Sequence, residues 1–143
     1  MTKLDPEIVK ALDLSRNPYG TYDHWWRIGH IKELFRYLWQ RPKYKRDRLR
    51  KGYTWWDLWD LDRYLLALLY VSLHEFADKT IGYPNEYETF ESWQQEIHEA
   101  ADKFGQLYKW EYSIDGEASR DDREGLMKKA FAWLGDHIEG LWI

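Results

Sequence analysis

Cations cluster in the segment 41–51, and they are the first residues here whose types and spacing suggest chemistry. RPKYKRDRLRK holds seven basic residues and one acid, a local charge of +6 within a chain of net charge −4, which leaves −10 for the remainder. Clustered lysine and arginine attract anions, and the planar guanidinium of arginine grips phosphate at two points. The segment therefore predicts a site for phosphate or an acidic partner, with a solvated loop as the plain alternative.

Aromatic residues within and just after this segment extend the predicted site. Tyrosine and tryptophan side chains stack on planar rings, so a nucleotide-like ligand is the leading expectation. Exposed tryptophans beside basic residues also suit a protein-binding patch or a homodimer interface. The residues expected to bind the ligand are Tyr44, Arg46, Arg48, Arg50, Lys51, Trp55 and Trp56.

Three acids at helical spacing suggest a second chemistry. Glu96, Glu99 and Asp102 form the pattern E-x-x-E-x-x-D. Carboxylates spaced in this way hold Mg²⁺ in helical nucleotide pyrophosphohydrolases, because hard cations take several oxygen ligands. In this segment Ile97 and Phe104 mark the apolar side of the helix, so the acids are predicted to point away from the core. We keep a magnesium-dependent hydrolase as an alternative and expect no catalytic residue, resident metal or cofactor.

A short echo places histidine and aspartate four residues apart in two segments. This spacing puts both side chains on one face of a helix, and two such pairs bind a metal only if they meet. Neither segment has the HExxH form, and the flanking residues do not repeat. We interpret them as solvated helix faces with local ion pairs. The segments are His74-Glu75-Phe76-Ala77-Asp78-Lys79 and His98-Glu99-Ala100-Ala101-Asp102-Lys103.

Three polar residues are predicted to be buried for structural reasons. Asp62 shares a helix side with leucines, and an unpaired buried carboxylate would cost several kcal/mol. His137 lies centrally on the apolar side of the last helix, and His30 lies near the apolar edge of an earlier one. We therefore predict that Asp62 accepts a hydrogen bond from His137, His30, Arg36 or a tryptophan indole, and so fixes how the helices pack.

One long helix, residues 54–82, is expected to position these groups. Thr54 and Asp57 form a capping-box-like start, while Gly82 followed by Pro84 forms the stop. The stretch from Tyr64 to Leu73 is apolar almost all the way round, which predicts a helix enclosed by protein.

Other amphipathic segments surround this centre. The chain is expected to be all-α, a compact single domain over 1–143 with four long helices and a short N-terminal helix. A helix over 22–40 should end at Pro42, with 41–51 as a basic connector. Further helices start after Thr89 and after Ser119, which has Asp122 three residues later. The organisation is 1–21 for the N-terminal helix and turn, and 22–143 for the bundle.

Composition narrows the class of protein. The chain has 143 residues with 10 Trp, 11 Tyr and 5 Phe, and it has no Cys, which excludes disulfides and cysteine-based zinc sites. No signal peptide is recognised, and the longest apolar run is about half of the roughly 20 residues that a membrane span needs. We expect a soluble cytoplasmic protein without a membrane partner. The acidic remainder makes nucleic acid a less favoured partner.

A pattern of fold-bearing residues resembles a group of uncharacterised small all-α proteins encoded by bacteriophages. The likeness covers roughly residues 50–110 and the tail. It implies a shared architecture and an accessory role in an infected bacterial cytoplasm. The residues that carry it are Gly52-Tyr53, Asp57, Trp59, Leu61-Asp62, Tyr64-Leu65, Gly82-Tyr83-Pro84, Trp93 and Leu141-Trp142.

Two hypotheses of function follow. The first is a non-enzymatic counter-defence or host-takeover factor that sequesters an anionic nucleotide-like ligand. The second is a protein–protein inhibitor that docks its aromatic patch on a host or defence enzyme.

Overall fold

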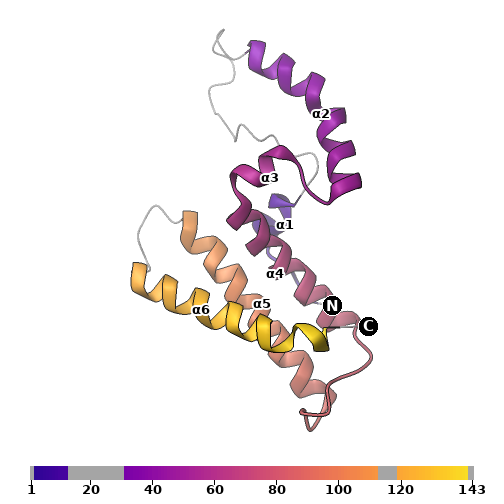
Figure 1. The fold of residues 1–143 in the computed structure, drawn as a ribbon, viewed down its shortest axis with the longest axis vertical. Helices are drawn as coiled ribbons and strands as arrows, with labels where there is room; N and C mark the ends of the chain where they lie inside the picture. The colour runs from indigo at the N-terminus through magenta and orange to yellow at the C-terminus, as the bar shows by residue number, and fades with distance from the viewer. Residues whose placement is uncertain (1, 13–30, 113–118, 142–143) are drawn as a thin grey trace.

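A computed structural model of the chain describes residues 2–12, 31–112 and 119–141. Within these residues all regular structure is helical, so the predicted all-α class is confirmed (Figure 1). In chain order the elements are α1 (Pro6–Ala11), α2 (Ile31–Lys51), α3 (Trp55–Trp59), α4 (Leu61–Lys79), α5 (Phe90–Tyr112), α6 (Arg120–His137) and the short 3-10 helix η2 (Ile138–Gly140).

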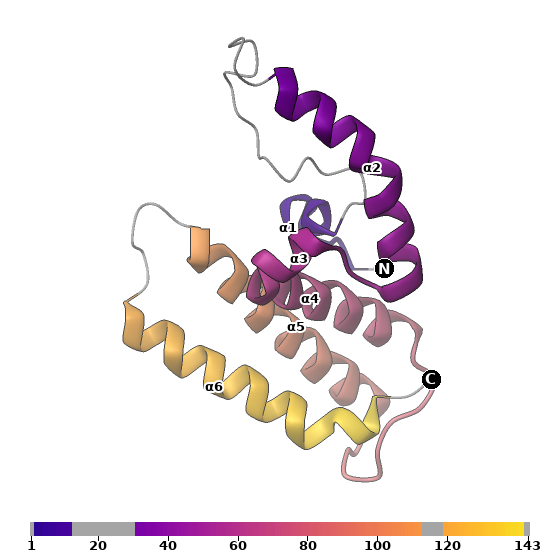
Figure 2. The ribbon, with the colours of Figure 1, turned by 45° about the horizontal axis from the view of Figure 1, so that its top comes forward.

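Helix α5 forms the centre of the hydrophobic core. It packs between α4 and α6, as Figures 1 and 2 both show. Its apolar residues recur at intervals of three and four, so one continuous stripe turns inward. The apolar side that the sequence predicted is Phe90, Trp93, Ile97, Ala101, Phe104 and Tyr108, and all of these except the half-buried Phe90 are buried. Ala100 and Leu107 are also fully buried.

Helix α4 is not the enclosed rod that the sequence predicted. The expected helix over 54–82 divides at Asp60, whose backbone angles (φ −118°, ψ 50°) are not helical, into α3 and α4. Leu61, Leu65 and Leu68 remain 44%, 39% and 39% exposed. Because α6 packs mainly on α5, one face of α4 is left open while the other buries Leu66 and its neighbours.

Helix α2 passes through Pro42 and ends only at Lys51. The predictions of a helix end at Pro42 and of a loop over 41–51 are therefore wrong. Proline lacks the N–H that would bond the preceding turn, and here the helix continues with that bond missing. Gly52 ends it, with φ of +82° in the left-handed region that favours glycine, and residues 22–30 lie outside the described part.

The long helices do not all join one bundle. Helices α4, α5 and α6 lie together, and α1 packs on α4 and buries Ile8, which is 1% exposed. Most of α2 extends away from them (Figures 1 and 2). A compact bundle of four long helices is thus not confirmed. We call α2 and α3, residues 31–59, the arm, and the assembly of α1, α4, α5 and α6 the body.

Candidate functional site

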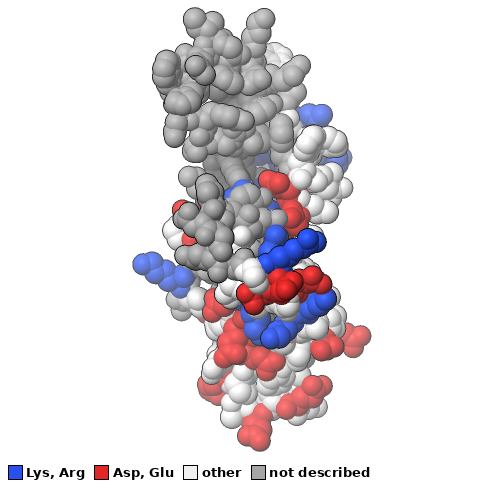
Figure 3. Space-filling view, turned by 90° about the vertical axis from the view of Figure 1, so that its left-hand side faces the viewer, with Lys and Arg blue, Asp and Glu red and all other residues white. Residues whose placement is uncertain are grey.

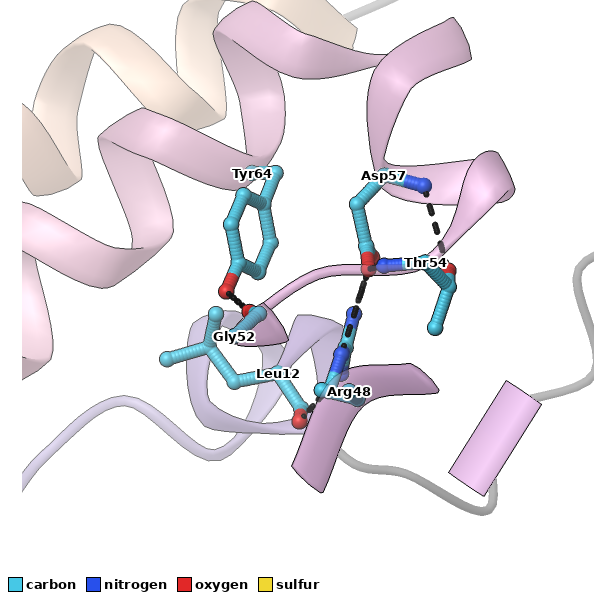
Figure 4. Close-up of polar contacts among 6 residues, drawn as sticks. All are labelled: Leu12, Arg48, Gly52, Thr54, Asp57 and Tyr64. Atoms are coloured by element: carbon cyan, nitrogen blue, oxygen red, sulfur yellow. Dashed lines mark hydrogen bonds and ion pairs between the residues drawn. The ribbon is translucent and has the colours of Figure 1, made fainter. Parts of the chain in front are cut away.

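The base of the arm is built around Arg48 (Figure 4). Its guanidinium donates to both carboxylate oxygens of Asp57, from Nε at 3.2 Å, and Nη1 donates to the carbonyl of Leu12 at 2.7 Å. The side chains of Arg48 and Asp57 are only 13% and 10% exposed. Arg48 was predicted to bind phosphate. In the structure its guanidinium instead bonds Asp57 of α3 and the Leu12 carbonyl at the end of α1, and so connects α1, α2 and α3.

The same carboxylate also caps α3. The hydroxyl of Thr54 accepts from the backbone N–H of Asp57, and the carboxylate of Asp57 accepts from the backbone N–H of Thr54. This capping box was predicted from the sequence and is confirmed. Tyr64 adds a further tie, since its hydroxyl donates to the carbonyl of Gly52 and its ring lies 5.2 Å from the Arg48 guanidinium carbon. We call Arg48, Asp57, Thr54 and Tyr64, with the carbonyls of Leu12 and Gly52, the joint. These contacts fix the direction in which the arm leaves the body.

The remaining predicted ligand-binding residues have exposed positions along the arm. Arg46, Arg50 and Lys51 are exposed, and Tyr44 is half-buried. Trp55 is 59% exposed and packs edge-on against Trp59, with ring centroids 6.2 Å apart. The side chain of Trp56 lies outside the described part of the chain. The structure thus places several cations and aromatic rings on one projecting element, without assigning them a ligand.

Large apolar side chains are also exposed on the arm. Their exposed fractions reach 88% for Trp39, 72% for Leu49 and 71% for Trp59. Exposed apolar side chains that gather on one element are candidates for an interaction site. Sequence reasoning predicted outward-facing tryptophans but not their concentration here, because it treated α2 as part of the bundle. The exposed apolar residues of the arm are Trp39, Leu49, Tyr53, Trp55, Leu58 and Trp59.

A second polar site lies in the body, where the two histidine–aspartate segments meet. Nδ1 of His74 lies 2.8 Å from Nδ1 of His98. Nε2 of His74 lies 3.2 Å from Asp102, and Nε2 of His98 lies 3.7 Å from Asp78. We call these four residues the histidine cross, since each pair spans α4 and α5. The interpretation of separate solvated faces is wrong, and the sequence echo was the signal that could have revealed the meeting.

The environment of the histidine cross is uneven. His74 is 3% exposed, and burial lowers the pKa of its ring. Its Nε2 makes no well-oriented hydrogen bond, although Asp102 is within ion-pair distance. On the other side, two hydrogen bonds from Thr2, led by that of its backbone N–H, hold the pKa of Asp78 below its usual value. The histidine cross therefore contains a buried ring, His74, that resists protonation, and a carboxylate, Asp78, that also binds the N-terminal segment.

A cleft of about 500 Å³ lies beside the histidine cross. Asp102 belongs to both, and Tyr70, whose ring packs edge-on against His74 at 4.7 Å, lines the cleft as well. The N-terminal segment forms its opposite wall with Lys3, Asp5 and Ile8. Chain order alone does not bring residues 3–8 next to 102–109, so sequence reasoning missed this cleft.

The three acids of the E-x-x-E-x-x-D pattern have separate partners. Glu96 accepts from the indole of Trp133 at 2.7 Å. Burial, followed by a hydrogen bond to Glu96, raises the pKa of Tyr87 to about 12. Glu99 accepts from Gln95 at 2.9 Å, while Asp102 faces His74. Among the described residues no group of three or more acids, histidines or cysteines is arranged to hold a metal ion.

The predicted buried polar residues also need correction. Asp62 is exposed, because the side of α4 that carries it is the side that stays open. His137 is half-buried, and its Nδ1 lies 2.8 Å from the Trp133 carbonyl while its Nε2 lies 3.9 Å from Glu96. His137 thus contributes to packing between α6 and α5. His30 lies outside the described residues.

Comparisons with family models, curated proteins and solved structures find no match to this chain. Among the described helices, none combines the length and apolar character required to cross a bilayer.

Proposed function

We propose that this chain is a non-enzymatic binding protein whose arm docks on an acidic patch of a partner protein. The observation that carries the proposal is the coincidence of exposed apolar and basic side chains on α2 and α3. Trp39 and Lys51 are twelve positions apart on one helix, which corresponds to about 18 Å at 1.5 Å per residue. That length suits a protein surface better than a single planar ring.

Charge supports an acidic partner. The segment 41–51 carries +6, and Arg46, Arg50 and Lys51 within it are exposed. Exposed cations around aromatic anchors speed encounter with an acidic surface, while the buried anchors supply most of the affinity. On the face drawn in Figure 3, carboxylates lie over the lower part of the molecule, with Lys and Arg side chains among them.

The joint at Arg48 supports presentation of a preorganised surface. Arg48 ties α2 to α3 through Asp57 and to the end of α1 through Leu12. Rigid presentation lowers the entropy that binding must overcome. If the resemblance to phage-encoded proteins reflects common origin, the partner would be a host or defence enzyme of an infected bacterium, and the chain would act as its inhibitor.

Site-specific photo-crosslinking tests the proposal. A photoreactive phenylalanine analogue replaces Trp39 or Trp59 in bacterial cells, and Ile81, which is 84% exposed outside the arm, provides the matched control position. We expect one conjugate from both arm positions and none from the control. The partner, identified by mass spectrometry and purified, should bind more weakly as salt rises and after charge reversal of Arg46, Arg50 and Lys51 to Glu.

Three results would contradict this function. These are equal conjugates from position 81, a conjugate with a second copy of the chain, and an affinity that charge reversal leaves unchanged. Each of these results would show that the arm, its charge or a separate partner protein is not part of the interaction.

A nucleotide-like ligand is a second candidate, favoured by the exposed edge-on pair of Trp55 and Trp59, which follows Lys51 by four and eight positions in the sequence. One of these rings could stack on a base while Arg50 and Lys51 contact phosphate. Titration with ATP, followed by tryptophan fluorescence, should then show quenching that Trp55→Ala abolishes. Quenching that survives this substitution would count against the candidate.

A further inference from the structure

The contacts of the histidine cross favour one particular number of hydrogens on its ring nitrogens. Its central contact, 2.8 Å between the two Nδ1 atoms, is a hydrogen bond only if one nitrogen carries hydrogen and the other is bare. On the outer sides, each Nε2 faces a carboxylate, which only accepts, so hydrogen on both Nε2 atoms is favoured. Three hydrogens therefore satisfy the arrangement, one at the centre and one at each outer nitrogen.

These contacts are satisfied neither when both imidazoles are neutral nor when both are charged. Two neutral imidazoles carry two hydrogens, which leaves a bare nitrogen such as Nε2 of His74 beside a carboxylate. Two charged imidazoles carry four, so two N–H groups would point at each other across 2.8 Å next to a ring that is 3% exposed. The second positive charge is thus incompatible with the packed geometry.

The N-terminal segment is attached to the same residues. The backbone N–H of Thr2 donates to Oδ2 of Asp78 at 2.8 Å and its hydroxyl donates to Oδ1 at 3.2 Å. The backbone N–H of Asp5 donates to the hydroxyl of Tyr70 at 2.9 Å, and the Tyr70 ring lies against His74. Movement of either histidine therefore reaches residues 2–5 through one intervening side chain.

We propose that the histidine cross is an acid-sensitive latch, in which double protonation separates the two rings, frees the N-terminal segment and opens the cleft beneath it. The latch is local, because α5 and α6 remain joined by their own core contacts. It is independent of the arm and of the function proposed for it.

Other charged groups also surround the histidine cross. Asp78 on α4 and Asp5 in the N-terminal segment have lowered pKa values, through hydrogen bonds from Thr2 and Lys109 respectively, and the positive charge of the N-terminus also lowers the pKa of Asp78. The hydrogen bond to Asp5 raises the pKa of Lys109 on α5. Glu75 and Lys79 pair with each other on the exposed side of α4, and Asp102 faces His74 from α5. Because histidine is the side chain whose ordinary pKa lies between about 5 and 7, replacing a histidine is the test that assigns the transition.

The free energy of unfolding should also fall as the pH is lowered. Burial lowers the folded-state pKa of His74 below its ordinary value of 6.5. Below that value the unfolded chain binds more protons than the folded chain does. The contribution of His74 is present above about pH 6.5 and is lost as pH falls toward its folded-state pKa.

Hydrogen exchange followed by mass spectrometry at about pH 7.5 and pH 5.5, corrected for intrinsic rates, tests the latch. We expect residues 2–12 to exchange about tenfold faster at the lower pH, while α6 stays unchanged. His98→Gln should reduce the acid response to the part that burial of His74 alone supplies, because one ring cannot meet a second charge. His137→Gln, the matched control, should keep it.

Equal protection at both pH values would overturn the latch, as would an acid response that keeps its full size in His98→Gln or disappears in His137→Gln. Should His98→Gln fail to fold, NMR titration of the ring carbons in the unmodified chain decides. The ring of His74 should take up its proton below its ordinary pKa of 6.5 and together with the release of residues 2–12, and protonation of His74 without that release would refute the proposal.

Discussion

The arm and the body place the same residue type in opposite environments. Trp93 in α5 has no exposed surface, whereas Trp39 in α2 is 88% exposed. Both helices are amphipathic, so local pattern does not explain the difference. Trp93 is flanked by two helices that pack on α5, whereas most of α2 extends away from the other helices. An apolar side chain stabilises the fold only where another element covers it, and elsewhere it is available to a partner.

Truncating the two tryptophans should give the largest contrast. Trp93→Ala removes a fully buried ring and should lower the free energy of unfolding by about 3–5 kcal/mol. Trp39→Ala should change it by less than about 0.5 kcal/mol. Urea denaturation measures both values, and a large loss for Trp39→Ala would show that the arm is part of the cooperative core.

Removing Arg48 should loosen the arm while leaving the body folded. Arg48→Ala leaves Asp57, only 10% exposed in its side chain, without its cation, a loss of about 3 kcal/mol in local stability. Thermolysin cleavage in residues 48–54 should accelerate, and the helical content of the body should persist. Arg46→Ala, at an exposed position of the same helix, is the control and should leave cleavage unchanged. Unaltered cleavage of Arg48→Ala would mean that other contacts fix the joint.

A glycine pair tests how tightly the cleft wall is packed. A Cβ at Gly105 would lie 2.8 Å from Cδ2 of Tyr70, so Gly105→Ala should push that ring and cost about 1–3 kcal/mol. A Cβ at Gly125 in α6 meets nothing within 4 Å, and Gly125→Ala should stabilise by about 0.5–1 kcal/mol through helix propensity. Thermal unfolding distinguishes opposite signs, and equal shifts would contradict the packing described.

The smallest expected effect concerns the ion pair between Asp5 and Lys109, 2.6 Å apart. The hydrogen bond from Lys109 lowers the pKa of Asp5 below 3.8, so the unfolded chain binds more protons there. This stabilisation is present above about pH 3.8 and is lost as pH falls through the folded-state pKa. Between about pH 5 and pH 3 the exchange of residues 2–12 should rise slightly further, and Lys109→Met should make that rise smaller by removing the share of Asp5. A rise of unchanged size in Lys109→Met would assign it to another group, such as Asp78.

Local signals predicted local structure well. The cap at Thr54, the start at Ser119 and the α5 stripe follow from residues within a few positions of each other, and the structure confirms them. The course of α2 through Pro42 and the exposure of Asp62 depend on which helices pack together, and that is not encoded in a single helical pattern. The histidine cross lies between these cases, since its sequence echo was visible but the meeting required the pairing of α4 with α5.

That pairing gives the histidine cross one more consequence. The two helices are antiparallel neighbours, so each histidine reaches the aspartate that follows the other histidine along the chain. Sliding α5 by one helical turn, about 5.4 Å, would break the central contact and both flanking ones at once. The four side chains therefore fix the axial register of α5 against α4, which form the largest interface in the body. Apolar residues spaced one turn apart would specify that register less strictly, because they could pack equally well after a slide of one turn.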